Sequence, residues 1–187
     1  EKFAAPEGNL YHDIRPQAFA MGAWLGAWTA LGLRRLPYGL ALRPTTAFES
    51  IEAYPWRGSM LDIAFGPTGH AVGLEVDGQF IPGTLQLPQN HLKAGETHAV
   101  RLIPAPQASL LLRSSVQLDG VERSHAETCY RFTAFGLSQM TFSAPLPAAA
   151  LTDSSGNPLP CRWTSDQGLH TCHFTHFGAG RLVTNAP

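Results

Sequence analysis

The sequence predicts a mainly β protein, an antiparallel β-sandwich region preceded by one buried apolar α-helix. After residue 37, apolar and polar residues alternate with period two in several runs, which is typical of half-buried strands. Turn-forming Gly, Asp and Asn residues separate these runs at intervals of roughly 8–12 residues, as in a sandwich. Before them, residues 16–33 carry no charge and have no period-two pattern, which favours a helix.

The composition argues against a nucleic-acid binder. Of the 187 residues, 44% are hydrophobic, which is enough for a sizeable core in one large domain or two small ones. Only 14% are charged and the net charge is −1, so the chain has no basic surface for phosphates. A low charge density fits a protein that buries much of its surface, or one with a neutral partner such as a sugar. Simple compositional bias is the alternative.

The uncharged segment PQAFAMGAWLGAWTALGL, residues 16–33, is expected to form a helix enclosed by protein on every side. A surface helix carries charged residues opposite its apolar stripe, and this segment has none. Pro16 suits the first turn, Asp13 lies next to the positive end, and the helix is predicted to end near Gly32. The segment is close to the lower limit of about 17–25 residues for a membrane span, but it is only mildly apolar, so a span is not expected.

Period-two patterns predict the strands of the first β part. The Asp77–Gly78 pair between two such runs is a strong signal for a tight hairpin. Residues 90–95 are predicted as a longer turn. The predicted strand regions are 60–65, 71–81, 84–87 and 98–103.

A second β part is predicted after Pro104 and Pro106. Its expected turns are Asp119–Gly120 and 153–158. Its expected strand regions are 109–118, 127–135, 138–143, a hairpin over 161–172, and 180–185. The predicted organisation is therefore a leader and helix over 1–36, a first sandwich part over 37–104 and a second over 105–187.

The three cysteines, Cys129, Cys161 and Cys172, do not have zinc-site spacing. A four-residue loop at 165–168 would place Cys161 and Cys172 opposite each other on a hairpin. A disulfide between them is then one possibility in an oxidising compartment, and two free thiols are the other.

The densest polar cluster in the sequence is YHDIR, immediately before the predicted helix. Asp13 could act as a catalytic acid or base, but capping the helix and pairing with Arg15 is the favoured explanation. Tyr11, His12 and Arg15 are predicted to contact substrate. A single carboxylate falls short of the pair that glycoside hydrolysis needs.

Two tryptophans, Trp56 and Trp163, are candidate stacking surfaces for sugar rings, although tryptophans in sandwiches commonly pack in the core. The cluster of His170, Cys172, His173 and His176 is interpreted as a half-exposed strand, so no metal site is predicted. Ser124, His125 and Glu127 are too close in sequence on a strand for a catalytic triad. We predict no cofactor, because no nucleotide or phosphate fingerprint is present.

The order of these elements resembles the C-terminal end of carbohydrate-active enzymes built on an (α/α)6 barrel, the glycoside hydrolases and disaccharide phosphorylases. The resemblance is carried by the apolar segment 18–33, by LALRP at 40–44, by WRGSMLDIAF at 56–65 and by VDGQFIPGTLQLP at 76–88. It implies that residues 16–33 form the last barrel helix and that residues 11–15 line part of the barrel's cleft. It also implies that most of the catalytic residues lie outside this chain.

The leading hypothesis is therefore the C-terminal portion of a glycoside hydrolase that acts on oligo- or polysaccharide. This portion would buttress the catalytic barrel and line part of its cleft. Its expected partners are carbohydrate and a larger helix-rich polypeptide, or the N-terminal part of the same enzyme, and not nucleic acid or membrane. The alternatives are a stand-alone carbohydrate-binding module and an assembly subunit that docks through its apolar helix.

Overall fold

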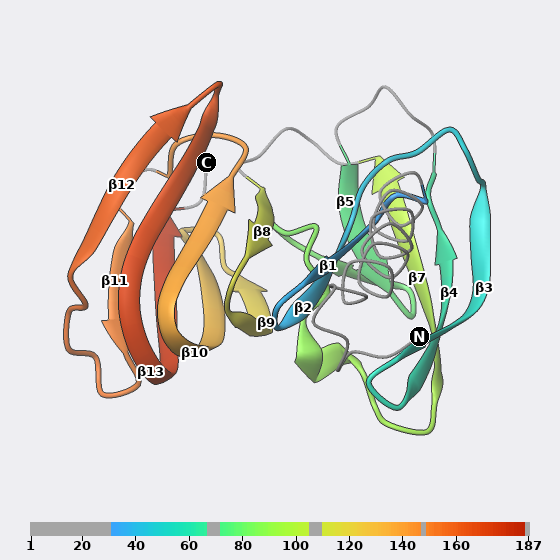
Figure 1. The fold of residues 1–187 in the computed structure, drawn as a ribbon, viewed down its shortest axis with the longest axis horizontal. Coiled ribbons are helices and arrows are strands. Elements are labelled where there is room, and N and C mark those ends of the chain that lie inside the picture. The colour runs from blue at the N-terminus through green and yellow to red at the C-terminus, as the bar shows by residue number, and fades with distance from the viewer. Residues whose placement is uncertain (1–30, 67–71, 105–109, 147–148, 186–187) are drawn as a thin grey trace, which may run out of the picture.

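The computed structural model describes residues 31–66, 72–104, 110–146 and 149–185, and it is mainly β (Figure 1). A hairpin of β1 (Leu33–Leu36) and β2 (Gly39–Leu42) lies between two larger sheets. One sheet holds β3 (Ser50–Trp56), β4 (Ser59–Ala64), β5 (Val72–Val76), β6 (Gln79–Ile81) and β7 (Thr97–Pro104). The other holds β8 (Leu111–Ser114), β9 (Gln117–Arg123), β10 (Glu127–Phe142), β11 (Ala150–Asp153), β12 (Cys161–Asp166) and β13 (Leu169–Asn185).

The described ranges contain one helical element, the 3-10 turn η1 (Gln89–His91). The leader and residues 16–30 of the predicted helix lie outside these ranges. Leu33, the last residue of the predicted helical stretch, is instead the first residue of β1. Gly32 precedes it with a φ of +74°, so the expected end of the apolar segment falls at a glycine turn. Within the described part, no helix is long and apolar enough to cross a membrane.

The five-stranded sheet confirms the predicted Asp77–Gly78 hairpin. Both residues have positive φ, and Val76 lies opposite Gln79, as a two-residue turn of this class requires. The purely antiparallel expectation is wrong for one pair of strands, β4 and β7, which run parallel, and for the isolated parallel bridge between Thr84 and Leu111. The strand order is β3-β4-β7-β5-β6, so the chain completes the β5–β6 hairpin and η1 before β7 returns beside β4.

The six-stranded sheet is built on two long strands, β10 and β13, which pair along their whole lengths. Two separate strands, 127–135 and 138–143, are predicted where the structure has one. Glycines with positive φ, Gly136 and Gly178, lie near the middle of each strand. Figure 1 shows both strands folding over, so that each crosses both layers of a small sandwich. Glycine permits such a bend without interrupting the pairing.

Two further expectations about this region are wrong. Asp119–Gly120 is predicted as a turn but lies inside β9, where the register with β10 shifts and forms a bulge. The turn falls earlier, between β8 and β9. Residues 84–87 are predicted as a strand but make only isolated bridges. Gln86 pairs with Ala41 of β2, and Thr84 pairs with Leu111 of β8.

This bridging segment joins the two halves of the molecule, residues 31–104 with β1–β7 and residues 110–185 with β8–β13. On one side the Leu42 amide donates to the Leu85 carbonyl oxygen (2.9 Å) and the Leu87 amide donates to Leu40 (2.8 Å). On the other side the Leu85 amide donates to Leu111 (2.9 Å). Buried apolar residues from both sheets form one continuous core around it.

The cysteines are free, and their expected geometry is wrong. The hairpin turn is the two-residue Gln167–Gly168, not a four-residue loop. Consequently Phe174 lies opposite Cys161 and Trp163 lies opposite Cys172, which places the two thiols diagonally. Directly facing cysteines would be needed for the predicted cross-strand geometry.

Candidate functional site

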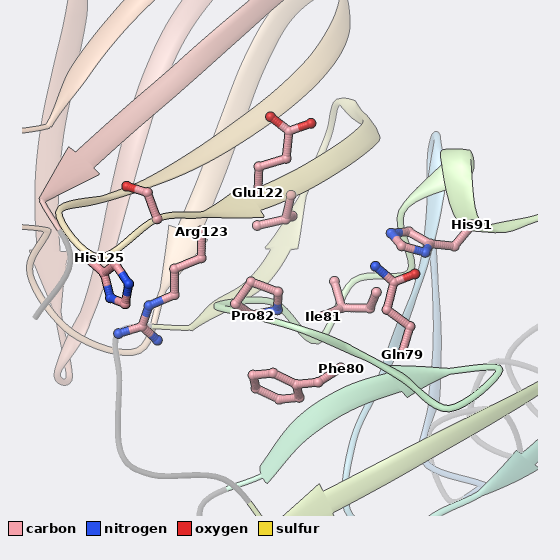
Figure 2. A pocket seen from close by; sticks show the side chains of 10 residues that line it. Gln79, Phe80, Ile81, Pro82, His91, Glu122, Arg123 and His125 are labelled. Carbon is pink, nitrogen blue, oxygen red and sulfur yellow. The ribbon is translucent and has the colours of Figure 1, made fainter.

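An open cleft of about 630 Å³ lies where the two halves meet (Figure 2). One wall comes from β6 and the turn after it, with His91 of η1 beside it. The other wall comes from the end of β9 and the turn into β10. The lining residues are Gln79, Phe80, Ile81, Pro82, His91, Val121, Glu122, Arg123, Ser124 and His125.

The β9–β10 turn holds Arg123 and His125 in place. The Ser124 hydroxyl accepts hydrogen bonds from the amides of Glu127 (3.0 Å) and Ala126 (3.3 Å), while the Ser124 amide donates to the Glu127 carbonyl oxygen (2.8 Å). Serine favours such local turns because its short hydroxyl reaches the backbone. Ser124 is therefore a turn residue, not a nucleophile. The turn leaves the side chains of Arg123 and His125 without a hydrogen bond or ion pair inside the described ranges.

The carboxylate of the cleft is already engaged. Glu122 forms an ion pair with Arg131, with 2.7 Å between Oε1 and a guanidinium nitrogen. Figure 2 shows its side chain pointing away from Phe80 and Pro82. Glu122 is the only Asp or Glu among the lining residues, all of which are described. The cleft thus has no pair of free carboxylates for acid–base or nucleophilic hydrolysis.

The opposite wall presents an aromatic ring. Phe80 is 44% exposed on β6, a high value for such a large apolar side chain. Gln79 and His91 also line the cleft. Burial lowers the pKa of His91 below its usual value, with a smaller opposing effect from Asp77. A neutral imidazole can both donate and accept a hydrogen bond.

Behind this wall, a buried histidine braces the β5–β6 turn. His98 Nδ1 donates to the Asp77 carboxylate (2.7 Å), whose other oxygen accepts from the Ala99 amide (2.8 Å). These bonds raise the pKa of His98 and lower that of Asp77. His98 Nε2 lies 2.9 Å from the Lys93 amide nitrogen and 3.3 Å from the Lys93 carbonyl oxygen, so the Lys93 backbone offers this nitrogen a partner whether or not it carries a proton. His98 is therefore fully used in holding the turn that carries Gln79 and Phe80.

The residues predicted from the sequence lie elsewhere. Tyr11, His12, Asp13 and Arg15 fall outside the described residues. Trp56 is half-buried, and two guanidinium groups lie over its ring, Arg35 at 5.8 Å and Arg57 at 5.5 Å from the ring centroid. Its surroundings favour a packing role, since cations already lie over the ring.

Trp163 is more accessible than Trp56. It is 38% exposed on β12 and packs at 6.2 Å from the ring of Phe142. Neither tryptophan lines the cleft. Their roles in sugar binding stay predictions.

The histidines of β13 have separate partners. His170 bonds Ser165 (2.8 Å), His173 bonds Thr164 (3.0 Å) and His176 bonds the Ala179 carbonyl oxygen (3.0 Å). Across the described ranges, no three His, Cys, Asp or Glu side chains converge as metal ligands do.

No protein-family model, curated protein or solved structure matches this chain. The resemblance to barrel-type carbohydrate-active enzymes therefore depends on the sequence features alone.

Proposed function

We propose that this chain is a saccharide-binding β-sandwich portion of a carbohydrate-active enzyme of the glycoside hydrolase type. The cleft beside Phe80 is the proposed binding surface. The observation that carries the proposal is one exposed aromatic ring surrounded by polar side chains with unused hydrogen-bonding capacity. These side chains are Gln79, His91, Arg123 and His125.

This composition fits the chemistry of a sugar. The C–H face of a pyranose packs against an aromatic ring, and its hydroxyls exchange hydrogen bonds with amide, imidazole and guanidinium groups. The cleft volume of about 630 Å³ lies within the roughly 300–1,000 Å³ of small-molecule sites. Because Glu122 is paired with Arg131, the site supports binding and not bond cleavage.

The direct test is calorimetric titration of the full chain with a panel of neutral oligosaccharides. Phe80→Ala should weaken binding roughly tenfold, the loss expected for one stacking surface. Phe48→Ala is a matched control, because Phe48 is 48% exposed and does not line the cleft. Equal effects of the two substitutions, or no binding of any oligosaccharide at millimolar concentration, would overturn the proposal.

We also propose that the chain works as the C-terminal part of a larger enzyme. The uncharged segment 16–33 leads directly into β1, and the hairpin it enters contributes the buried residues Leu33, Leu40 and Leu42 to the core. A helix formed by this segment and packed among the helices of a catalytic barrel would be anchored to the sandwich at once. Residues 11–15 would then line the catalytic cleft, and the sandwich would buttress the barrel.

Native mass spectrometry of the chain purified from its source distinguishes the two proposals. Co-purification with a larger helix-rich polypeptide, or detection of the chain as part of one, supports the second. A monodisperse monomer that binds oligosaccharide would contradict the second proposal and would leave only the saccharide-binding part of the first.

A further inference from the structure

A second, smaller pocket of about 150 Å³ lies at the junction of the two halves and is lined by three arginines, Arg34, Arg43 and Arg113. It is separate from the cleft beside Phe80, with which it shares no lining residue. The remaining lining residues are Leu42, Leu85, Leu112, Thr141 and Leu169. Four leucines therefore surround three positive charges.

Paired backbone fixes each arginine. Arg34 lies opposite Ala41 in the β1–β2 hairpin, and the Arg43 amide donates to the Gly32 carbonyl oxygen (2.8 Å). Arg113 lies opposite Thr141 in the pairing of β8 with β10. Two of the arginines thus come from the β1–β2 hairpin and its end and the third from β8, and all three line one pocket because β2 and β8 are in contact.

No counter-charge accompanies them. Among the described residues, none of the three guanidinium groups forms an ion pair or a hydrogen bond, and the pocket lining contains no carboxylate. Partial burial, together with the charges of Arg113 and Arg43, lowers the pKa of Arg34. Like charges beside apolar walls repel strongly and raise the free energy of the folded state. Such a cost is offset when an anion binds among them.

We propose that this pocket binds one small oxyanion: a phosphate or sulfate group, or the carboxylate of an acidic sugar. Planar guanidinium groups form paired, charge-assisted hydrogen bonds with all of these. The Thr141 hydroxyl supplies one further polar group in the lining, already bonded to Thr171 at 3.1 Å. The pocket is smaller than the roughly 300 Å³ at which small-molecule sites begin, which matches a single anionic group.

Because Arg34 and Arg43 belong to the β1–β2 hairpin and its end and Arg113 belongs to β8, the bound anion would also hold the hairpin to the six-stranded sheet. The proposal does not depend on saccharide binding in the cleft, and the two can fail separately.

The test is thermal unfolding of the full chain with increasing inorganic phosphate, at ionic strength kept constant with chloride. The melting temperature should rise and then saturate. Arg113→Gln should weaken the apparent phosphate affinity at least roughly tenfold, the expected loss of a charge-assisted bond. Arg162→Gln is the matched control, because Arg162 is an exposed arginine on β12 outside the pocket. An equal phosphate response in both variants and the wild type would overturn the proposal.

The unliganded protein gives a second readout. If the pocket lacks a counter-charge, Arg113→Gln should raise the melting temperature in chloride alone, because it removes repulsion. If an acidic residue from outside the described ranges fills the pocket, the substitution should lower it and phosphate should have no effect. That result would also overturn the proposal.

Parallel titrations with sulfate and glucuronate identify the source of the oxyanion. A saturating rise of the melting temperature with phosphate, sulfate or glucuronate supports the site.

Discussion

The hydroxyl of Tyr130 donates a hydrogen bond of 3.0 Å to the carbonyl oxygen of Gly83, across the junction between the two halves. Tyr130 is 1% exposed, and burial raises its pKa well above the usual range, which favours the protonated hydroxyl that donates this bond. An alanine at position 83 would place its Cβ only 2.6 Å from the hydroxyl oxygen of Tyr130. A side chain in strand β10 thus fixes the segment that leads from the cleft wall into the central bridge.

Tyr130→Phe should lower the free energy of unfolding by about 1–2 kcal/mol, because the buried Gly83 carbonyl oxygen loses this donor while the ring packing is kept. Urea denaturation measures the change. Tyr38→Phe is the control, since Tyr38 lies on the surface at the β1–β2 turn and makes no side-chain hydrogen bond within the described ranges. Equal stability of the two variants would show that the hydrogen bond has no net effect.

The fold of β10 upon itself provides a second prediction. The rings of Tyr130 and Phe142 pack edge-on with 5.5 Å between their centroids, although both belong to this strand. In a straight strand, residues twelve apart would be separated by about 40 Å. The bend depends on Gly136 and Gly178, whose φ values are +121° and +105°.

Gly178→Ala tests the energetic cost of the positive φ alone, because a Cβ at this position would meet no atom within 4 Å. The substitution should cost about 1–3 kcal/mol from the positive φ alone. Thr175→Ala, at an exposed position in the same strand, should change stability by less than about 0.5 kcal/mol. Urea denaturation of both variants decides the matter. A neutral Gly178→Ala would mean that the bend is fixed by packing and not by glycine.

These cases show what local sequence can and cannot predict. Asp77–Gly78 forms the predicted hairpin because both residues tolerate positive φ and the flanking strands alternate in phase. Asp119–Gly120 is the same dipeptide, yet it forms a bulge because its register is set by β10. Likewise, the sequence predicts a break between two strands at residues 136–137, whereas in the structure the alternation of buried and exposed residues continues through these positions and one strand bends without ending.

The cleft is harder still to predict from the sequence. Phe80 and His125 lie in two hairpins that are remote in the chain, and only the packing of the halves brings them to one cleft. The sequence feature that could have indicated the cleft is the pair of turns, Asp77–Gly78 and the serine turn at 124. The residues that follow them directly, Gln79, Phe80 and His125, are not part of the core. The arginine pocket gave no signal, because Arg34, Arg43 and Arg113 share no motif.

A pH-dependent effect is expected at His91. Burial lowers its pKa below 6.5, so the folded state binds fewer protons than the unfolded state as pH falls into this region. Stability from this group is therefore complete above about pH 6.5 and declines below it. NMR titration of the histidine ring signals should give a midpoint for His91 below 6.5. His91→Gln should reduce the loss of stability between about pH 6.5 and 5, and a midpoint above 6.5 would contradict the assignment.

The two thiols of the β12–β13 hairpin should react at very different rates. Cys161 is exposed, whereas Cys172 is buried, and burial followed by the neighbouring Cys161 thiol raises the pKa of Cys172 far above its usual value. The reactive species is the thiolate, so the native protein should be alkylated at Cys161 at least roughly tenfold faster than at Cys172. Timed N-ethylmaleimide labelling with peptide mass spectrometry measures both rates. Unfolding in urea should equalise them, which controls for intrinsic differences between the two sequences. Comparable rates in the folded protein would show that the hairpin opens readily, since Cys172 reaches solvent only when β12 separates from β13.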